Sequence, residues 1–180
     1  MLRISQLIVA GIACGAAHTA SPSHPPKPTP AGLCQAGEVV LFRCDFNGKA
    51  ASLCGHLARR AEPSATYRFG TRNRLELVHT AARSNPTGFS YANFGYAGGG
   101  ETQIYFENHG YRYVLYDRIV RTAFGPDGLH DPKATAGITV YRAGKIVGRR
   151  ICSNDLDAAI MSGRLEGYIE QMERRDPEGT

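Results

Sequence analysis

Three glutamates stand in alternating runs of the sequence that predict β-strands: Glu76, Glu101 and Glu107. Glycoside hydrolysis needs two carboxyl groups that face each other across a cleft, and neighbouring strands can supply such a pair. A strand glutamate near an arginine more often forms a cross-strand ion pair, and arginines occur in the same runs. The carboxylates therefore indicate glycan hydrolysis only as the alternative to a binding role.

The sequence gives less support for an active site with a serine nucleophile, for a histidine-based site or for a metal site. The motif G-x-S-x-G is absent, and none of the six histidines has a partner at the spacing of a metal site. His79 is interpreted as a residue near a strand end whose hydrogen bond is satisfied. Asp127 and Asp131 lack the regular alternation of oxygen ligands that a calcium loop shows. We therefore assign no catalytic residue, no metal ligand and no cofactor.

The candidate binding residues surround three consecutive glycines at residues 98–100. Tyrosine offers a large contact area with a polar end, and mobile glycines would let a loop fit a partner. The alternative is that the aromatic side chains belong to the core and the glycines form a turn between strands. The candidate residues are Tyr91, Asn93, Tyr96, Glu101 and Tyr105.

The elements that must position these side chains start with a disulfide-bonded hairpin at residues 34–55. Its first strand alternates, with Val40, Phe42 and Cys44 on the face that we expect to point into the core. Asn47-Gly48 then predicts a two-residue type I′ turn, because both residue types tolerate the positive φ angles of that turn.

Such a turn places Leu41 opposite Cys54, and Cys44 and Cys54 then point to opposite faces and cannot bond each other. Cys34 lies at the open end of the hairpin beside Cys54, whereas Cys44 points toward the later strand that carries Cys152. Of the three connectivities we favour Cys34 with Cys54 and Cys44 with Cys152. A bulged three-residue turn would reverse the argument. Zinc is disfavoured, because nine residues separate successive cysteines of the hairpin.

The N-terminal region predicts export. Arg3 precedes an apolar run at residues 7–17, which indicates a secretory signal peptide over residues 1–20. The run is too short to cross a bilayer, so we expect no transmembrane segment. Cleavage after the run would release a periplasmic or secreted protein, and cleavage before Cys14 would instead leave a cysteine for a lipid anchor.

Composition divides the remainder of the chain. Residues 21–33 are rich in proline and predict an extended tether, which leaves residues 34–180 as a single disulfide-bonded domain. The formal net charge is +5, but the arginines are spread along the chain and form no concentrated stripe. We therefore expect no nucleic-acid partner.

Alternating runs joined by turn signals continue after the hairpin, and they predict strands through residue 152. Residues 122–135 are interpreted as a long surface loop, and residues 154–175 predict one or two short helices. The fold class is mainly β: an antiparallel β-sandwich or barrel built from hairpins, with one or two short C-terminal helices. The expected later strands are residues 65–70, 74–80, 89–96, 101–108, 111–121, 136–142 and 145–152.

Several short motifs occur together between Cys34 and Cys152. They are Gly37-Glu38, the strand ending in Cys44, Gly48-Lys49, Ser52-Leu53-Cys54, Tyr67-Arg68-Phe69-Gly70, Glu76, Phe89-Ser90-Tyr91, Gly98-Gly99-Gly100, Tyr113 and a late cysteine. As a set they resemble a family of small, uncharacterised exported proteins of Gram-negative bacteria. The resemblance covers most of the chain between these two cysteines and implies export and a β-rich fold, without an activity. The length of the loop at residues 122–135 departs from the family pattern.

These observations favour an exported, non-enzymatic binding module of the cell envelope, of the inhibitor or immunity type. The expected partner is an envelope protein or glycan. The alternative function is an envelope glycan hydrolase that uses strand carboxylates.

Overall fold

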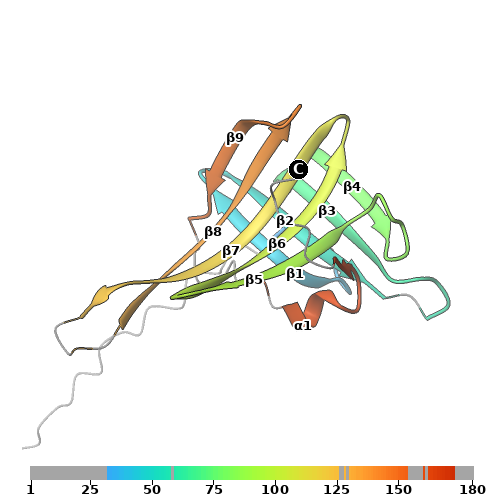
Figure 1. Ribbon diagram of the computed structural model, residues 1–180. Coiled ribbons are helices and arrows are strands. Elements are labelled where there is room, and N and C mark those ends of the chain that lie inside the picture. The colour runs from blue at the N-terminus through green and yellow to red at the C-terminus, as the bar shows by residue number, and fades with distance from the viewer. Residues whose placement is uncertain are drawn as a thin grey trace, which may run out of the picture.

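The computed structural model describes residues 32–57, 59–125, 128, 130–153, 160 and 162–172, so the expected signal peptide, Cys14 and most of the tether lie outside the described residues. Nearly all described residues belong to strands or to the turns between them (Figure 1). The first sheet contains β1 (Val39–Phe46), β2 (Lys49–His56), β3 (Ser64–Thr71) and β4 (Arg74–Ala82). The second contains β5 (Ser90–Tyr96), β6 (Gly99–Asn108), β7 (Tyr111–Phe124), β8 (His130–Arg142), β9 (Lys145–Ile151) and β10 (Glu170–Gln171).

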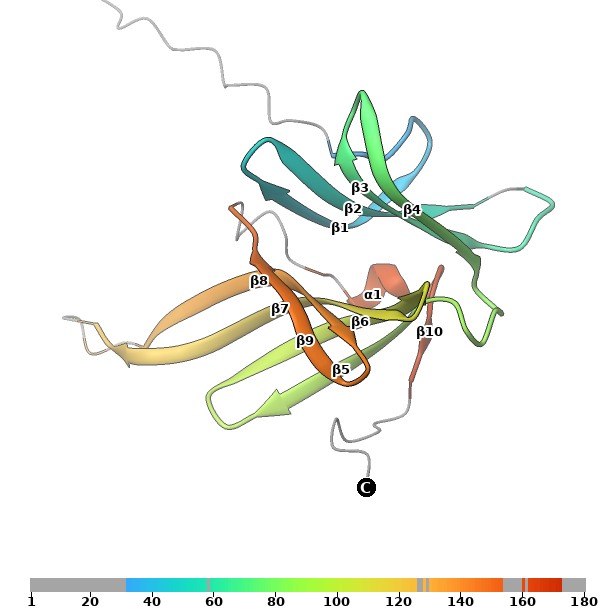
Figure 2. The same ribbon diagram turned by 90° about the horizontal axis from the view of Figure 1, so that it is seen from above.

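The two sheets lie face to face as a sandwich (Figure 2). Strand order is β1-β2-β3-β4 in one sheet and β10-β5-β6-β7-β8-β9 in the other. All neighbours are antiparallel except β10, which pairs with β5 in parallel. The expectation of a mainly β, hairpin-built sandwich is therefore confirmed, and the helical part is small: α1 (Ser162–Leu165) covers one end of the core.

Two-residue turns connect several strand pairs. His109-Gly110 and Ala143-Gly144 have positive φ at both residues, as a type I′ turn requires. Asn47-Gly48 is also a two-residue turn, since Phe46 pairs with Lys49, but only Gly48 has a positive φ. The turn length was predicted correctly and the type I′ assignment was wrong.

A β-bulge at Leu41 changes the register of the first hairpin. Cys54 pairs with Val40, not with Leu41, and the pairing shifts by one residue before Phe42. Leu41 is consequently buried and Val40 is 41% exposed, which corrects the expected inward orientation of Val40. Cys44 still pairs with Ala51, so Cys44 and Cys54 point to opposite faces as predicted.

Both predicted disulfides are confirmed. Cys34 and Cys54 are joined with their Cα atoms 5.5 Å apart, and Cys44 and Cys152 with their Cα atoms 4.9 Å apart. The first bond ties the segment before β1 to the outer face of the four-stranded sheet. The second bond lies in the core and connects β1 to the residue after β9.

The core fills the space between the two sheets. Phe42, Leu53 and Tyr67 face Ile104 and Phe106, and all are almost completely buried. Aromatic rings lie in contact across the sheets, with the Tyr67 and Phe106 centroids 4.8 Å apart. This packing assigns alternate residues of β6, β7 and β8 to the core and the intervening residues to the opposite, outer face.

Two stretches differ from the expected loops. β7 and β8 continue through most of residues 122–135, with Arg121 paired to Pro132, and they form an arm that extends beyond the sheets (Figure 1). Pro132 is tolerated there because β9 ends opposite Gly137, which leaves that edge of β8 free. Gly99 and Gly100 belong to β6, so the triple glycine is not a loop. No helix in the described ranges has the length and hydropathy needed to cross a membrane.

Candidate functional site

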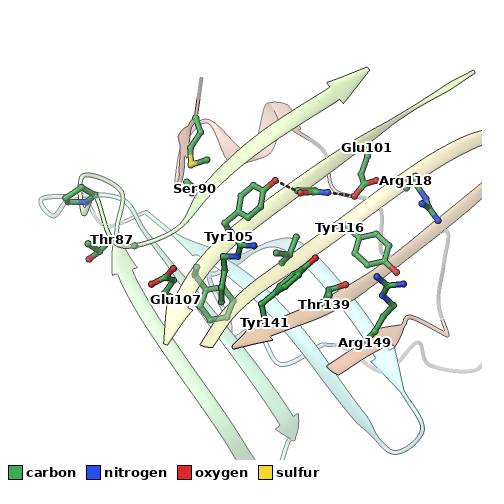
Figure 3. Close-up of a pocket in the computed structure, with 17 residues that line it drawn as sticks. Thr87, Ser90, Glu101, Tyr105, Glu107, Tyr116, Arg118, Thr139, Tyr141 and Arg149 are labelled. Atoms are coloured by element: carbon green, nitrogen blue, oxygen red, sulfur yellow. Dashed lines mark hydrogen bonds between the residues drawn. The ribbon is translucent and has the colours of Figure 1, made fainter. Parts of the chain in front are cut away.

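A hollow with a defined set of side chains lies on the outer face of the six-stranded sheet. Its volume is about 740 Å³, and we call it the outer groove (Figure 3). Most of the residues that line it alternate with core residues on four adjacent strands, and the loop before β5, Ser90, Phe106 and Met172 complete the lining. The side chains of the four strands are Glu101, Gln103, Tyr105 and Glu107 from β6, Arg112, Val114, Tyr116 and Arg118 from β7, Thr139 and Tyr141 from β8, and Arg149 from β9.

The floor of the groove depends on a glycine. Gly137 pairs with Tyr116, and the phenol of Tyr116 lies across the backbone of Gly137. A Cβ atom at position 137 would lie 2.5 Å from Tyr116 Oη and 2.5 Å from the carbonyl oxygen of Arg150. Glycine is therefore needed here for close approach, and it lets the ring lie flat against the sheet.

A chain of hydrogen bonds runs along β6 inside the groove. The Tyr105 hydroxyl donates to Gln103 Oε1, and Gln103 Nε2 donates to Glu101 (Figure 3). Burial, together with the nearby Glu101 carboxylate, raises the pKa of Tyr105 to about 12. Tyr105 therefore keeps its proton at neutral pH and remains a hydrogen-bond donor.

The charges of the groove are mixed, with three arginines and two glutamates. Glu101 lies opposite Arg118 and Glu107 lies opposite Arg112 in the pairing of β6 with β7. The Arg112 guanidinium lies over the Tyr141 ring, 4.8 Å from its centroid. Between described residues, no carboxylate lies within ion-pair distance of Arg118 or Arg149. Both of these arginines are exposed to solvent.

The structure separates the five candidate binding residues. Glu101 and Tyr105 line the outer groove. Tyr91 is fully buried in the core, and Asn93, which accepts a hydrogen bond from Thr102, lies on the same side of the sheet as Tyr91. Tyr96 is 42% exposed at the end of β5. The five residues do not form one surface.

Sequence analysis missed most of the outer groove. Gln103, Arg112, Tyr116, Tyr141 and Arg149 line it, and none of them was a candidate. Their alternation within β6, β7 and β8 was visible in the sequence, but both faces of β6 and β7 carry aromatic side chains. Only the strand order brings the polar face of four strands together.

The three strand glutamates do not form a catalytic pair. Glu76 lies on the four-stranded sheet, with its carboxylate 2.7 Å from Lys49 Nζ. Glu101 and Glu107 share one face of β6 but stand six residues apart, which is about 20 Å along a strand. Glycosidases hold their carboxyl groups roughly 5 to 9.5 Å apart. The geometry therefore gives the hydrolase alternative no support.

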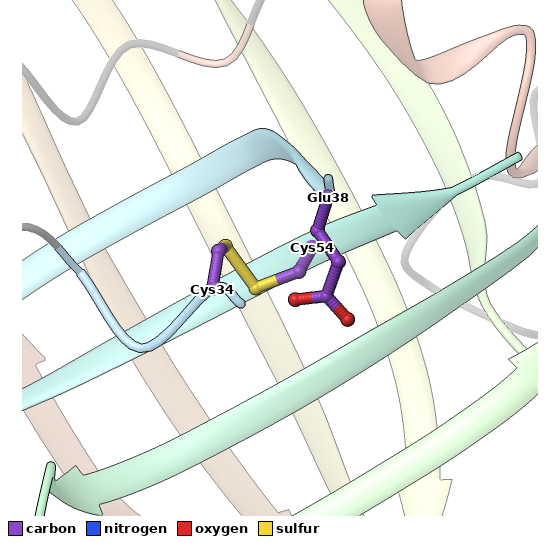
Figure 4. Close-up of side chains that lie close together, drawn as sticks. All are labelled: Cys34, Glu38 and Cys54. Atoms are coloured by element: carbon purple, nitrogen blue, oxygen red, sulfur yellow. A yellow bond between two sulfur atoms is a disulfide. The ribbon is translucent and has the colours of Figure 1, made fainter. Parts of the chain in front are cut away.

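Cys34, Glu38 and Cys54 form a compact cluster on the four-stranded sheet, with ligand-type atoms within 4.8 Å of one another (Figure 4). Both sulfur atoms are joined in the disulfide, so neither is a thiolate that could hold a metal ion. Glu38 accepts two hydrogen bonds from Arg68, at 2.7 and 2.8 Å, and both side chains are 8% exposed. The cluster is therefore a structural clamp between the segment before β1 and β3.

His79 packs against the aromatic core and does not line the outer groove. Its ring stacks on Phe106 with centroids 5.1 Å apart and meets Phe89 edge to face. Burial lowers the pKa of His79, although a hydrogen bond with Asn108 opposes the shift. Its Nε2 atom is buried without a partner among the described residues, so the expectation of a satisfied hydrogen bond holds for only part of the ring.

The outer groove can donate and accept hydrogen bonds, stack flat ligands on tyrosine rings and neutralise anions, and among the described residues that line it no serine or threonine hydroxyl is hydrogen-bonded to a carboxylate. It is therefore the candidate binding site of the described chain. Comparison with protein-family models, with curated proteins and with solved structures finds no match to this chain.

Proposed function

We propose that this protein is an exported, non-enzymatic binding module of the cell envelope, which holds its partner in the outer groove. One observation carries the proposal: tyrosines and arginines from four strands point into the same hollow, on a rigid sheet. Tyrosine and arginine are enriched among the few residues that contribute most of the binding free energy at protein interfaces. Side chains on strands are also held more firmly than side chains on loops.

Binding is favoured over catalysis by what the groove contains. Its ionisable side chains are arginines, glutamates and tyrosines, and the two glutamates lie far apart on β6. Tyr105 keeps its proton at neutral pH, so it is suited to donating a hydrogen bond and not to accepting a proton.

Export is supported by the two disulfides, because such bonds persist in oxidising compartments. We place the mature protein in the periplasm or outside the cell, after removal of residues 1–20. The lipid-anchored alternative predicts that Cys14→Ser moves the protein from the membrane fraction to the soluble fraction. We expect no change in fractionation.

The test of function uses two adjacent arginines on opposite faces of β9. Arg149 lines the groove, whereas Arg150 faces the other sheet and lies over the Phe46 ring. Immobilised protein would be exposed to an envelope extract, and retained protein and glycan would be measured separately. A partner kept by the unchanged protein and by Arg150→Gln, but lost by Arg149→Gln, would support the groove. Equal retention by both variants, or turnover of a retained glycan or peptide, would contradict the proposal.

A further inference from the structure

The composition of the outer groove narrows the class of ligand, and we infer that the ligand is a carboxylated glycan. This inference rests on the proposed binding function. It depends on three properties of the groove: two arginines without a carboxylate partner among the described residues, tyrosine rings on adjacent strands, and a lining that contains none of the large exposed hydrophobic side chains of the described chain.

The charge of the groove favours an anion. Glu101 accepts a hydrogen bond from Gln103, and Glu107 lies opposite Arg112, which already stacks on Tyr141. Arg118 and Arg149 remain, with no carboxylate partner among the described residues. Guanidinium groups bind carboxylates through two parallel hydrogen bonds, so two such groups in one hollow favour a ligand that carries carboxylates.

The two arginines stand at separate points of the groove. Arg118 pairs with Thr135 on β8, and Arg149 pairs with Thr139 on the same strand. These partners are four residues apart, which is about 13 Å along the strand. Figure 3 shows Tyr116 between the two arginines. A ligand that meets both must therefore be extended and must repeat its negative charge, as a polymer of acidic sugars does.

The tyrosines suit a sugar ring. Tyr105, Tyr116 and Tyr141 come from three adjacent strands, and the Tyr116 ring lies flat over Gly137. A pyranose ring has an apolar face of C–H bonds and a rim of hydroxyl groups. Tyrosine rings can cover that face, while Gln103 and Thr139 offer hydrogen bonds to the hydroxyl groups.

Two other classes of ligand, a protein and a nucleic acid, fit the groove less well. A protein partner normally buries an apolar centre, but the large exposed hydrophobic side chains of the described chain, such as Val78, Phe124 and Ile146, lie outside the groove. A nucleic acid carries a phosphate at every residue, and Glu101 and Glu107 inside the groove would repel such a continuous charge. Both classes are therefore included as competitors in the test.

The experiment measures binding of the mature protein to polymers of similar length. The carboxylated glycans are polygalacturonate, alginate and hyaluronate, the neutral control is dextran, and the other polyanions are poly-L-glutamate and oligothymidylate. The test variant is Arg118→Gln with Arg149→Gln. The control variant is Arg74→Gln with Arg150→Gln, which removes the same charge outside the groove.

We expect at least one carboxylated glycan to bind about tenfold or more tightly than dextran. The test variant should lose about tenfold for each arginine, because a hydrogen bond to a charged group is worth about that factor. The control variant should bind like the unchanged protein. Equal binding of dextran, equal or tighter binding of poly-L-glutamate or oligothymidylate, or equal loss in both variants would overturn the inference. If the envelope extract still yields a partner that depends on Arg149, the binding function stands without the glycan; if it yields none, both fail.

Discussion

The disulfide between Cys44 and Cys152 should contribute more stability than the disulfide between Cys34 and Cys54. The bonds close loops of 108 and 20 residues. In the chain-entropy description these loops correspond to about 4.8 and about 3.3 kcal/mol, so the difference is about 1.5 kcal/mol. Cys44 and Cys152 are also buried in the core, where a serine hydroxyl without a partner would cost roughly 1 to 3 kcal/mol more.

Two double variants isolate this comparison: Cys44→Ser with Cys152→Ser, and Cys34→Ser with Cys54→Ser. Urea unfolding followed by circular dichroism gives the free energy of unfolding of each variant. We expect the core variant to lose about 2.5 to 4.5 kcal/mol more than the outer one, which is roughly 5 to 18 °C in Tm for a domain of this size. The two corresponding Ala variants separate loop entropy from the buried hydroxyl.

Equal losses in the two Ser variants would refute this reasoning. A larger loss for the outer pair would show that Cys34 and Cys54 hold more than a short loop, because Cys54 is fully buried beside the clamp of Glu38 and Arg68. Peptide mapping of the unreduced protein provides an independent check, since a bond between Cys44 and Cys54 would contradict the opposite facing of these residues.

Three further perturbations test the rest of the structure. Burial lowers the pKa of His79 below its ordinary 6.5, so near that pH the unfolded chain binds more protons than the folded chain. The free energy of unfolding should therefore decrease as the pH falls below 6.5. The variant His79→Phe should flatten the profile of Tm against pH, and an unchanged profile would refute the assignment. Glu38→Gln should cost about 3 kcal/mol in urea unfolding, because it leaves the Arg68 charge buried, and Glu38→Leu with Arg68→Met should recover most of the loss. Gly137→Ala should lower the free energy of unfolding by about 1 to 3 kcal/mol, because the added Cβ atom would overlap the Tyr116 hydroxyl. Gly148→Ala is the control, since a Cβ atom there would meet only Val140, at 3.9 Å. Equal effects of the two substitutions would contradict the close approach at Gly137.

Most strands were predictable because residue types typical of tight turns mark where they end. His109-Gly110 and Ala143-Gly144 were recognised as turns between alternating runs, and their positive φ angles agree. The facing of Cys44 and Cys54 followed from a period of two, and it survived the bulge at Leu41 because the bulge lies beyond Cys44.

The errors arose where pairing overrides local signals. Residues 122–135 contain glycines and prolines and were interpreted as a loop, yet most of them lie in β7 or β8, because these two strands pair with each other beyond the sheet. Gly99 and Gly100 suggested a mobile turn, but Gly99 lies against the carbonyl of Ile119, where a side chain would not fit. A single sequence does not reveal that such a glycine is required by a neighbouring strand.

The outer groove was not predictable from the sequence for a different reason. Glu101 and Tyr105 were recognised, but Arg149 joins them only through strand order, 48 and 44 residues later in the chain. Which face of β6 lies outward is decided by the packing of Ile104 and Phe106 on the other sheet. Local alternation could identify two faces without indicating which one faces solvent.

The order of the strands has a consequence for how the chain folds. β1 to β4 are consecutive neighbours in one sheet, and β5 to β9 are consecutive neighbours in the other. Almost every ladder therefore closes a short loop, and the contact order within each sheet is low for an all-β protein, which favours rapid pairing. The contacts between the two sheets are the ones that join distant parts of the chain, and the bond between Cys44 and Cys152 spans 108 residues. In hydrogen exchange the two sheets should accordingly behave as two cooperative units once that bond is reduced.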